Sequence, residues 1–143
     1  MRLMHLCAAI LCMSLGAESL ATDTQFTLKI RVIHALKSGS GISPSLTDLK
    51  ADLAQLNYSG FKLIDGHTKK VFEREVVALE YPGSRWLQVR TRGVKKGALQ
   101  VSLKVRDLKF KAKVRIPDGS TILVGGPAHK GGNIILAVTA TRL

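Results

Sequence analysis

Cysteine is almost absent from this chain, and its two cysteines, Cys7 and Cys12, both lie within the first 21 residues. We interpret that leading segment as a cleavable export signal. Residues 22–143 then carry no thiol, which excludes disulfides, cysteine metal sites and thiol nucleophiles from the exported domain. A domain of about 120 residues buries enough apolar surface to fold without such cross-links.

Aromatic side chains are also few and make up 5% of the chain. In the most basic part of the sequence only Trp86 and Phe110 occur. Proteins that bind single-stranded nucleic acid stack the bases on several exposed rings. The shortage of rings therefore argues against nucleic acid as a partner, and it leaves phosphate contacts alone as a route to DNA.

An apolar run stands at the start of the sequence. Arg2 precedes the apolar segment 3–15, and Ser19-Leu20-Ala21 offers the small residues that a signal peptidase reads. Cleavage after Ala17 is an alternative. The run is shorter than the ~20 residues of a membrane-spanning helix, so we expect no transmembrane segment after cleavage. We predict a signal peptide at 1–21 and a single β-rich domain at 22–143, because no proline-rich or low-complexity linker divides the chain.

Apolar and polar residues alternate from Phe26 to Val32, as they do in a half-buried strand. After a break at residues 37–41, the period changes to that of a helix between Ser43 and Leu56. Leucines recur there at spacings of three and four, so we expect one short amphipathic helix that packs its leucine stripe on the core. The stripe consists of Leu46, Leu49, Leu53 and Leu56.

From Gly60 onward the chain has the pattern of strands separated by turn residues. Segments 61–64 and 71–81 flank residues 65–68 (Asp-Gly-His-Thr), which we predict to form a hairpin turn. Residues 82–84 (Pro-Gly-Ser) predict another turn. Roughly seven to nine short strands favour a mainly β fold, an antiparallel two-layer β-sandwich with one short α-helix on its N-terminal side.

The clearest strand pair covers residues 99–116. Its apolar residues occupy odd positions up to Val105 and even positions from Leu108, so the parity switches at Arg106-Asp107. A two-residue loop there places Val105 opposite Leu108 and gathers every apolar residue on one face. Arg-Asp is not a favoured pair for so tight a turn, and a slightly longer turn is the alternative.

The same part of the chain is strongly basic: eleven Lys or Arg residues and a single acid lie between Arg85 and Arg115, in a chain of net charge +12. The predicted register puts like charges opposite each other on the outer face, for example Lys104 and Lys109, which destabilises the strand pair. One interpretation is that the lysines protect an exposed edge strand from aggregation. The other is that an anionic partner docks on this face. The candidate binding residues are Arg90, Arg92, Lys104, Lys109, Lys111, Lys113 and Arg115.

Residues 114–127 contain a strand, an Asp-Gly turn, a second strand and Gly-Gly, and are similar to the core domain of bacterial outer-membrane secretins. Residues 133–142 resemble the apolar strand that follows in that family. The chain departs from the family pattern at Ala140, where proline is usual, and at Pro127, where leucine is usual. Its 143 residues do not hold the ring domains and barrel of a whole secretin. The resemblance covers about 30 residues and implies a β-type protein of a Gram-negative envelope, in the periplasm or at the cell surface.

The glycine-rich segment 125–133 raises the question of a phosphate-binding loop. It lacks the Gly-Lys-Ser/Thr ending of a P-loop, and it joins two predicted strands and does not open a helix. We interpret it as a flexible hairpin loop. His129 and Lys130 at its tip are candidate contact residues.

Catalytic patterns find little support in this sequence. The histidines of the exported domain stand in no metal-ligand spacing, and we expect neither a metal nor another cofactor. No Gly-x-Ser-x-Gly or Ser-x-x-Lys motif occurs. A hydrolase that uses Glu73/Glu75 or Asp65/His67 is kept as an alternative, but we expect no enzymatic activity.

We therefore predict a non-enzymatic exported envelope protein that binds an acidic partner through a basic β-face, as an accessory or structural component of a secretion or surface assembly. An exported protein meets acidic envelope proteins and anionic envelope polymers before it meets nucleic acid. The alternative of the same class is a binding module for anionic polysaccharide or lipid head groups.

Overall fold

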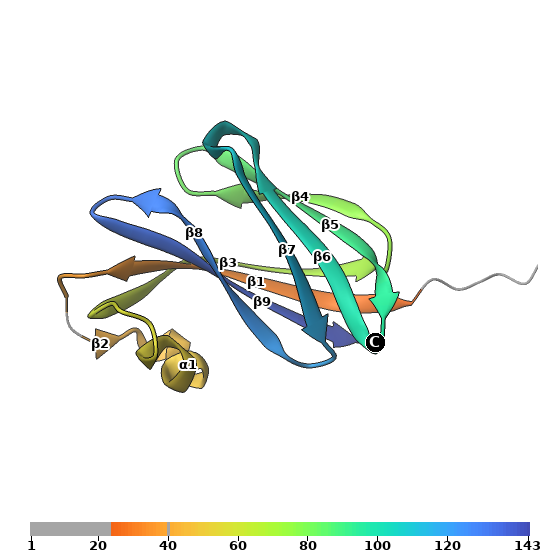
Figure 1. The fold of residues 1–143 in the computed structure, drawn as a ribbon, viewed down its shortest axis with the longest axis horizontal. Helices are drawn as coiled ribbons and strands as arrows, with labels where there is room; N and C mark the ends of the chain where they lie inside the picture. Colours follow the sequence, from red (N-terminus) through yellow and green to blue (C-terminus); the bar gives the residue numbers. More distant parts are fainter. Residues whose placement is uncertain (1–23, 40) are drawn as a thin grey trace, which may run out of the picture.

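The computed structural model describes residues 24–39 and 41–143, and the predicted export signal lies outside the described residues. Two β-sheets pack face to face, and a short helical segment covers part of the outer side of one sheet (Figure 1). The predicted two-layer β-sandwich with one short helix is confirmed. Its described elements are β1 (Gln25–Leu36), β2 (Gly41–Ile42), η1 (Pro44–Leu49), α1 (Lys50–Ala54), β3 (Gly60–Phe72), β4 (Val76–Tyr81), β5 (Arg85–Lys95), β6 (Ala98–Val105), η2 (Arg106–Leu108), β7 (Phe110–Pro117), β8 (Thr121–His129) and β9 (Gly132–Arg142).

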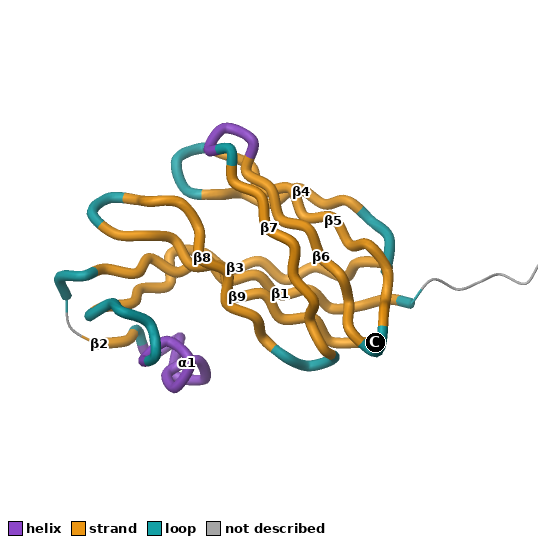
Figure 2. The backbone as a smooth tube through the Cα atoms, viewed as in Figure 1, coloured by secondary structure: helices purple, strands orange, loops and turns teal. Residues whose placement is uncertain are grey.

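The first sheet has the strand order β2-β3-β1-β9-β8, and the second has the order β4-β5-β6-β7. Neighbouring strands are antiparallel, with β2 and β3 as the parallel exception. The chain leaves the first sheet at residues 73–75 and returns to it at residues 118–120. The second sheet is therefore a meander of four consecutive strands joined by turns, as the tube in Figure 2 shows.

The main core fills the space between the two sheets, because alternate side chains of each strand point to that side. Leu28 and Ile30 of β1 pack there against Leu87 of β5 and Leu103 of β6, all at most 1% exposed. Complete burial of one such side chain contributes about 1.5–3 kcal/mol. This core fixes which side of the second sheet is left to face solvent.

A second, smaller core lies on the opposite face of the first sheet, beneath the helical segment. The predicted leucine stripe is confirmed, since Leu46, Leu49 and Leu53 are buried there and Leu56 packs against them. The helix is less regular than predicted: Leu46 has non-helical dihedral angles, and η1 is a 3₁₀ helix that passes into only a short α-helix. Neither helical segment of the described ranges has the length and apolar character that a membrane crossing requires.

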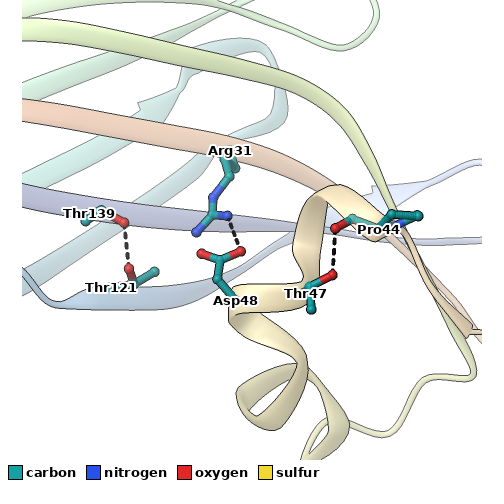
Figure 3. A network of polar contacts seen from close by, with 6 residues as sticks. All are labelled: Arg31, Pro44, Thr47, Asp48, Thr121 and Thr139. Atoms are coloured by element: carbon teal, nitrogen blue, oxygen red, sulfur yellow. Dashed lines mark hydrogen bonds and ion pairs between the residues drawn. The ribbon is translucent and has the colours of Figure 1, made fainter.

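One ion pair ties the helical segment to the first sheet (Figure 3). Arg31 of β1 is only 5% exposed, and its Nη1 donates to Oδ1 of Asp48 in η1 at 2.9 Å. This hydrogen bond holds the pKa of Asp48 below its usual value, which keeps the carboxylate charged. Figure 3 also shows the hydroxyl pair of Thr121 and Thr139, 2.6 Å apart, which links β8 to β9.

The predicted hairpin turn at residues 65–68 is wrong, because β3 passes through these residues without a break. The register of β3 against β1 slips by one residue at Ile64, which forms a β-bulge. The bulge exchanges the two faces of the strand, so that Phe61 enters the second core and Val71 enters the main core. The Asp-Gly signal thus lies beside a bulge in a continuous strand.

The chain reverses instead at residues 73–75, where Thr91 of β5 holds the turn. Its buried hydroxyl donates to the carbonyl oxygen of Phe72 at 2.8 Å and accepts from the amide of Glu75 at 2.7 Å. A single threonine therefore satisfies backbone groups on both sides of the crossing between the sheets.

The strands β6 and β7 form the predicted hairpin, but its loop is the longer alternative. Leu108 belongs to the 3₁₀ turn η2, and Lys109 follows in the left-handed conformation with φ of 52°. Val105 consequently lies opposite Phe110, which shifts the pairing by two residues from the predicted register. A shift of two residues preserves parity, so the apolar residues stay on the inner face.

The predicted hairpin at residues 125–133 is present, but the predicted extent of its loop is wrong, since β8 continues to His129 and β9 begins at Gly132. The reversal uses only Lys130 and Gly131, whose φ angles are 39° and 77°. Two consecutive positive φ angles are the geometry of the tightest hairpin turns. The glycine-rich segment is therefore mostly strand.

Candidate functional site

The outer side of the second sheet gathers most of the predicted binding residues. Because Leu87, Leu103 and their inner neighbours face the core, the alternate residues of β5, β6 and β7 face solvent. Nine of these form what we call the basic face, six cations and three neutral polar residues without an acid. They are Gln88, Arg90 and Arg92 on β5, Gln100, Ser102 and Lys104 on β6, and Lys111, Lys113 and Arg115 on β7.

The register between β6 and β7 fixes how these side chains face one another. Lys104 lies opposite Lys111, and Ser102 lies opposite Lys113. Six of the seven predicted binding residues thus share one surface. Lys109 does not share it, because it belongs to the turn before β7 and not to the strand.

A groove, which we call the basic groove, runs along β6 in the middle of the basic face. Ser102 has the shortest side chain of the nine, so the floor is lowest between the longer side chains of β5 and β7. Nε of Arg92 donates to Oγ of Ser102 at 2.7 Å, which holds this guanidinium at the floor. The main part of the groove has a volume of about 410 Å³. Its polar lining comprises Gln88, Arg90, Arg92, Ser102, Lys104, Lys111 and Lys113, and it continues toward Gln100 and Arg115.

Carboxylates do not neutralise these charges within the described part of the chain. Lys104 directly opposite Lys111 is a like-charge pair, which destabilises a strand pair by a few tenths of a kcal/mol or more. Folding alone does not favour this arrangement. Three close contacts between a basic and an acidic side chain occur among the described residues, and none includes the basic face. They are Arg31–Asp48, His67–Asp65 and Arg74–Glu73.

The strand order separates the two interpretations of the lysines. β7 is an edge strand, so its three cations fit the protection of that edge from aggregation. Arg90 and Arg92 lie on β5, and Lys104 lies on β6, and both strands are paired on each side. An interior strand has no free edge, so edge protection does not account for these three cations.

Four residues of this surface were not among the predicted binding residues. Gln88, Gln100 and Ser102 have the same parity as their cationic neighbours, and the alternation that pointed to the cations was sufficient to find them. Trp86, the sole tryptophan of the chain, precedes Gln88 on the same face of β5 and is 61% exposed. Glu80 of β4 lies opposite it. An exposed ring therefore stands at one end of the basic groove.

The other contact candidates, His129 and Lys130, lie in the β8–β9 hairpin of the first sheet, away from the basic face (Figure 1). Nε2 of His34 is 2.8 Å from the carbonyl oxygen of His129, and the two rings meet edge to face with centroids 5.1 Å apart. Burial of the ring, and then the nearby His34 and Lys130, lower the pKa of His129. The lowered pKa favours the neutral form of the His129 ring.

Asp65 and His67, one pair of the hydrolase alternative, hold two strands together. Nε2 of His67 lies 3.3 Å from Oδ2 of Asp65 and 3.1 Å from the carbonyl oxygen of Glu80. The first contact is within β3, and the second reaches across to β4. This arrangement gives the imidazole a structural role between the two sheets.

Glu73 and Glu75, the other pair of that alternative, lie in the turn between β3 and β4. Oε2 of Glu75 accepts from the amide of Phe72 at 2.9 Å, and Glu73 lies 3.8 Å from the exposed Arg74. Both carboxylates thus have contacts inside the turn. In residues 24–39 and 41–143, no group of three or more His, Cys, Asp or Glu is placed to hold a metal ion.

Comparison with known proteins found no match: no family model, no curated protein and no solved structure is similar enough to the chain to count as a relative.

Proposed function

We propose that this protein is a non-enzymatic, exported envelope protein that binds an anionic partner in its basic groove. The observation that carries the proposal is the set of cations on interior strands, Arg90, Arg92 and Lys104. Edge protection does not explain them, and no ion pair of the described residues includes them. A binding role gives these charges a reason to be there.

The electrostatics of the groove favour an extended partner over a small ion. Cations on both walls of a concave surface add their potentials and draw an anion to the floor. Each contact at an exposed site contributes only about 0.2–1 kcal/mol, so useful affinity requires several contacts made together. A partner with repeated negative charges makes them along the whole groove.

The export signal predicted at 1–21 and the resemblance of 114–142 to secretins support a place in a Gram-negative envelope. There the protein would act as an accessory or structural component of a secretion or surface assembly. Export also sets the available anions, which are acidic proteins and anionic polymers of the envelope.

The test neutralises the interior cations and compares the result with an equal charge change elsewhere. The groove variant is Arg90→Gln/Arg92→Gln/Lys104→Gln. The control variant is Lys50→Gln/Lys69→Gln/Lys70→Gln, which changes three exposed lysines outside the basic face. We expect the groove variant to bind dextran sulfate about tenfold more weakly by titration calorimetry, since three contacts of about 0.5 kcal/mol are lost.

The salt series and the melting temperature complete this test. The affinity of the groove variant should fall less steeply with salt than that of the wild type, because fewer counterions are released on binding. Both variants should melt as cooperatively as the wild type. Equal weakening in the two variants would assign the binding to net charge and refute the groove.

A further inference from the structure

The floor of the basic groove and its β5 wall offer more than positive charge. Gln88, Gln100 and Ser102 are neutral, and their amide and hydroxyl groups both donate and accept hydrogen bonds. A carboxylate, sulfate or phosphate oxygen accepts hydrogen bonds, so a site for bare anions needs only donors. A surface that also accepts hydrogen bonds is suited to hydroxyl groups, because hydroxyl groups both donate and accept them.

Trp86 adds an aromatic surface at the end of the β5 wall. Residues two apart on a strand are about 7 Å apart on the same face, so the ring stands next to Gln88. Trp86 is 61% exposed, so most of its surface is accessible to a ligand. The C–H faces of sugar rings pack on such rings, and burial of an aromatic side chain is a large source of binding energy.

The dimensions of the groove suit a single polymer chain. From Gln100 to Lys104 the floor extends about 14 Å, and the walls on β5 and β7 are separated by about 10 Å, twice the strand spacing. Cations stand on both sides over this length. A linear chain therefore fits lengthwise with its charged groups directed to either wall.

We infer that the basic groove binds an acidic polysaccharide. Its carboxylate or sulfate groups pair with the wall cations, its hydroxyl groups bond to Gln88, Gln100 and Ser102, and one sugar ring packs on Trp86. This inference rests on the proposed function and names the chemical class of the partner.

Other anionic partners use less of this site. A lipid surface presents its head groups in a plane and leaves the concave floor without contacts. An acidic polypeptide supplies the negative charges but carries few hydroxyl groups for the floor. An acidic polysaccharide uses the walls, the floor and the ring together.

The experiment compares ligands matched in charge and different in chemistry. The probes are polygalacturonate, polyglutamate at equal carboxylate concentration, uncharged dextran, and phosphatidylglycerol vesicles. Because Trp86 is the sole tryptophan, intrinsic fluorescence reports on this end of the groove. We expect polygalacturonate to bind about tenfold more tightly than polyglutamate, a difference of about 1.4 kcal/mol, and to shift the emission to shorter wavelength.

Substitution of Trp86 tests the contribution of the aromatic ring to binding separately. Trp86→Ala should weaken polygalacturonate binding about five- to tenfold by calorimetry and leave polyglutamate binding unchanged. Trp86→Phe keeps an aromatic face and should recover part of the loss. Phe72→Ala removes another exposed aromatic side chain, on β3, and should have no effect.

The possible outcomes distinguish this inference from the proposal beneath it. Polyglutamate could bind as tightly as polygalacturonate, with both losing affinity in the groove variant. That result would refute the inference that the partner is a polysaccharide and leave the proposed function standing. Preferential binding to vesicles would also refute the polysaccharide inference, and would favour lipid head groups as the partner. If the groove variant and its lysine control bind every probe equally, both the inference and the proposed function fail.

Discussion

The substitution Lys111→Glu should make the fold more stable and should weaken the binding of polyanions in the basic groove. Lys111 lies directly opposite Lys104 in the β6–β7 ladder, so the substitution turns a repulsive pair into an attractive one. Side-chain charges across such a pair lie roughly 7 Å apart, which corresponds to about 0.6 kcal/mol of Coulomb energy in water. Reversal of the sign is therefore worth about 1 kcal/mol at low ionic strength.

Lys113→Glu is the matched control for this substitution. Lys113 is also exposed on β7, but it faces the neutral Ser102. Each variant makes the same change in net charge, and repeating both on a Lys104→Gln background isolates the direct pair with Lys104 from other attractions, such as that of Lys113→Glu to Arg92. We expect Lys111→Glu to exceed Lys113→Glu in stability by about 0.5–1 kcal/mol, which is roughly 2–5 °C in Tm for a domain of this size.

Urea unfolding followed by circular dichroism measures this difference at 10 mM and at 1 M NaCl. The Debye length falls to about 3 Å at 1 M salt, so the difference should nearly vanish there. Both variants should bind dextran sulfate more weakly than the wild type. Equal stabilities at low salt, or a difference that persists at high salt, would refute the electrostatic reasoning.

Three further substitutions test other contacts. Asp48→Asn should lower stability at pH 7 by under about 1 kcal/mol, because the carboxylate is exposed. The folded-state pKa of Asp48 is lowered. The contribution of its carboxylate to stability is therefore fully present above about pH 4 and is lost as the pH falls through that lowered value. Thr91→Val should cost about 1–3 kcal/mol by leaving backbone groups of the β3–β4 turn unsatisfied. Leu53→Ala should cost about 2–4 kcal/mol through a cavity beneath the helix, with unchanged affinity for dextran sulfate.

Chemical unfolding over a range of pH checks the first of these, and unfolding at pH 7 checks the other two. If the difference in unfolding free energy between wild type and Asp48→Asn stayed constant from pH 7 to pH 2, the charge of Asp48 would not be the cause of that difference. Asp48→Ala, which also removes the acceptor from the buried Arg31, should be the less stable variant. A wild-type stability for Thr91→Val, or weaker polyanion binding by Leu53→Ala, would contradict the roles given to these residues.

The alternation of apolar residues predicted most of the fold, because side chains alternate along a strand whatever its partner is. Turn positions were less predictable. Asp65-Gly66 lies beside a bulge, and the Gly125-Gly126 segment lies in a strand, since bulges and hairpins use the same residue types. Which of them forms depends on a partner strand distant in the sequence, β1 in the first case.

The candidate site was predictable to the extent that parity decided it. Parity alone placed six cations on one face, and a two-residue error in register left that result intact. Sheet order is a long-range property, so the local pattern did not show that β5 and β6 are interior strands. Trp86 counted in the sequence only as one of the two aromatic residues of the basic stretch, and its exposure beside the cations became evident from its place on the outer face of β5.

The meander also bears on how the chain folds. Its hairpins are local, whereas the first sheet closes only when β1 meets β9, in pairs such as Phe26 with Arg142, more than a hundred residues apart. Local contacts form faster than distant ones, so we expect the four-stranded sheet to form before the first sheet covers its apolar face. Such intermediates are prone to aggregate. In that state the cations of β7 act before any partner is bound, because they keep the free edge of one half-folded sheet from pairing with the edge of another.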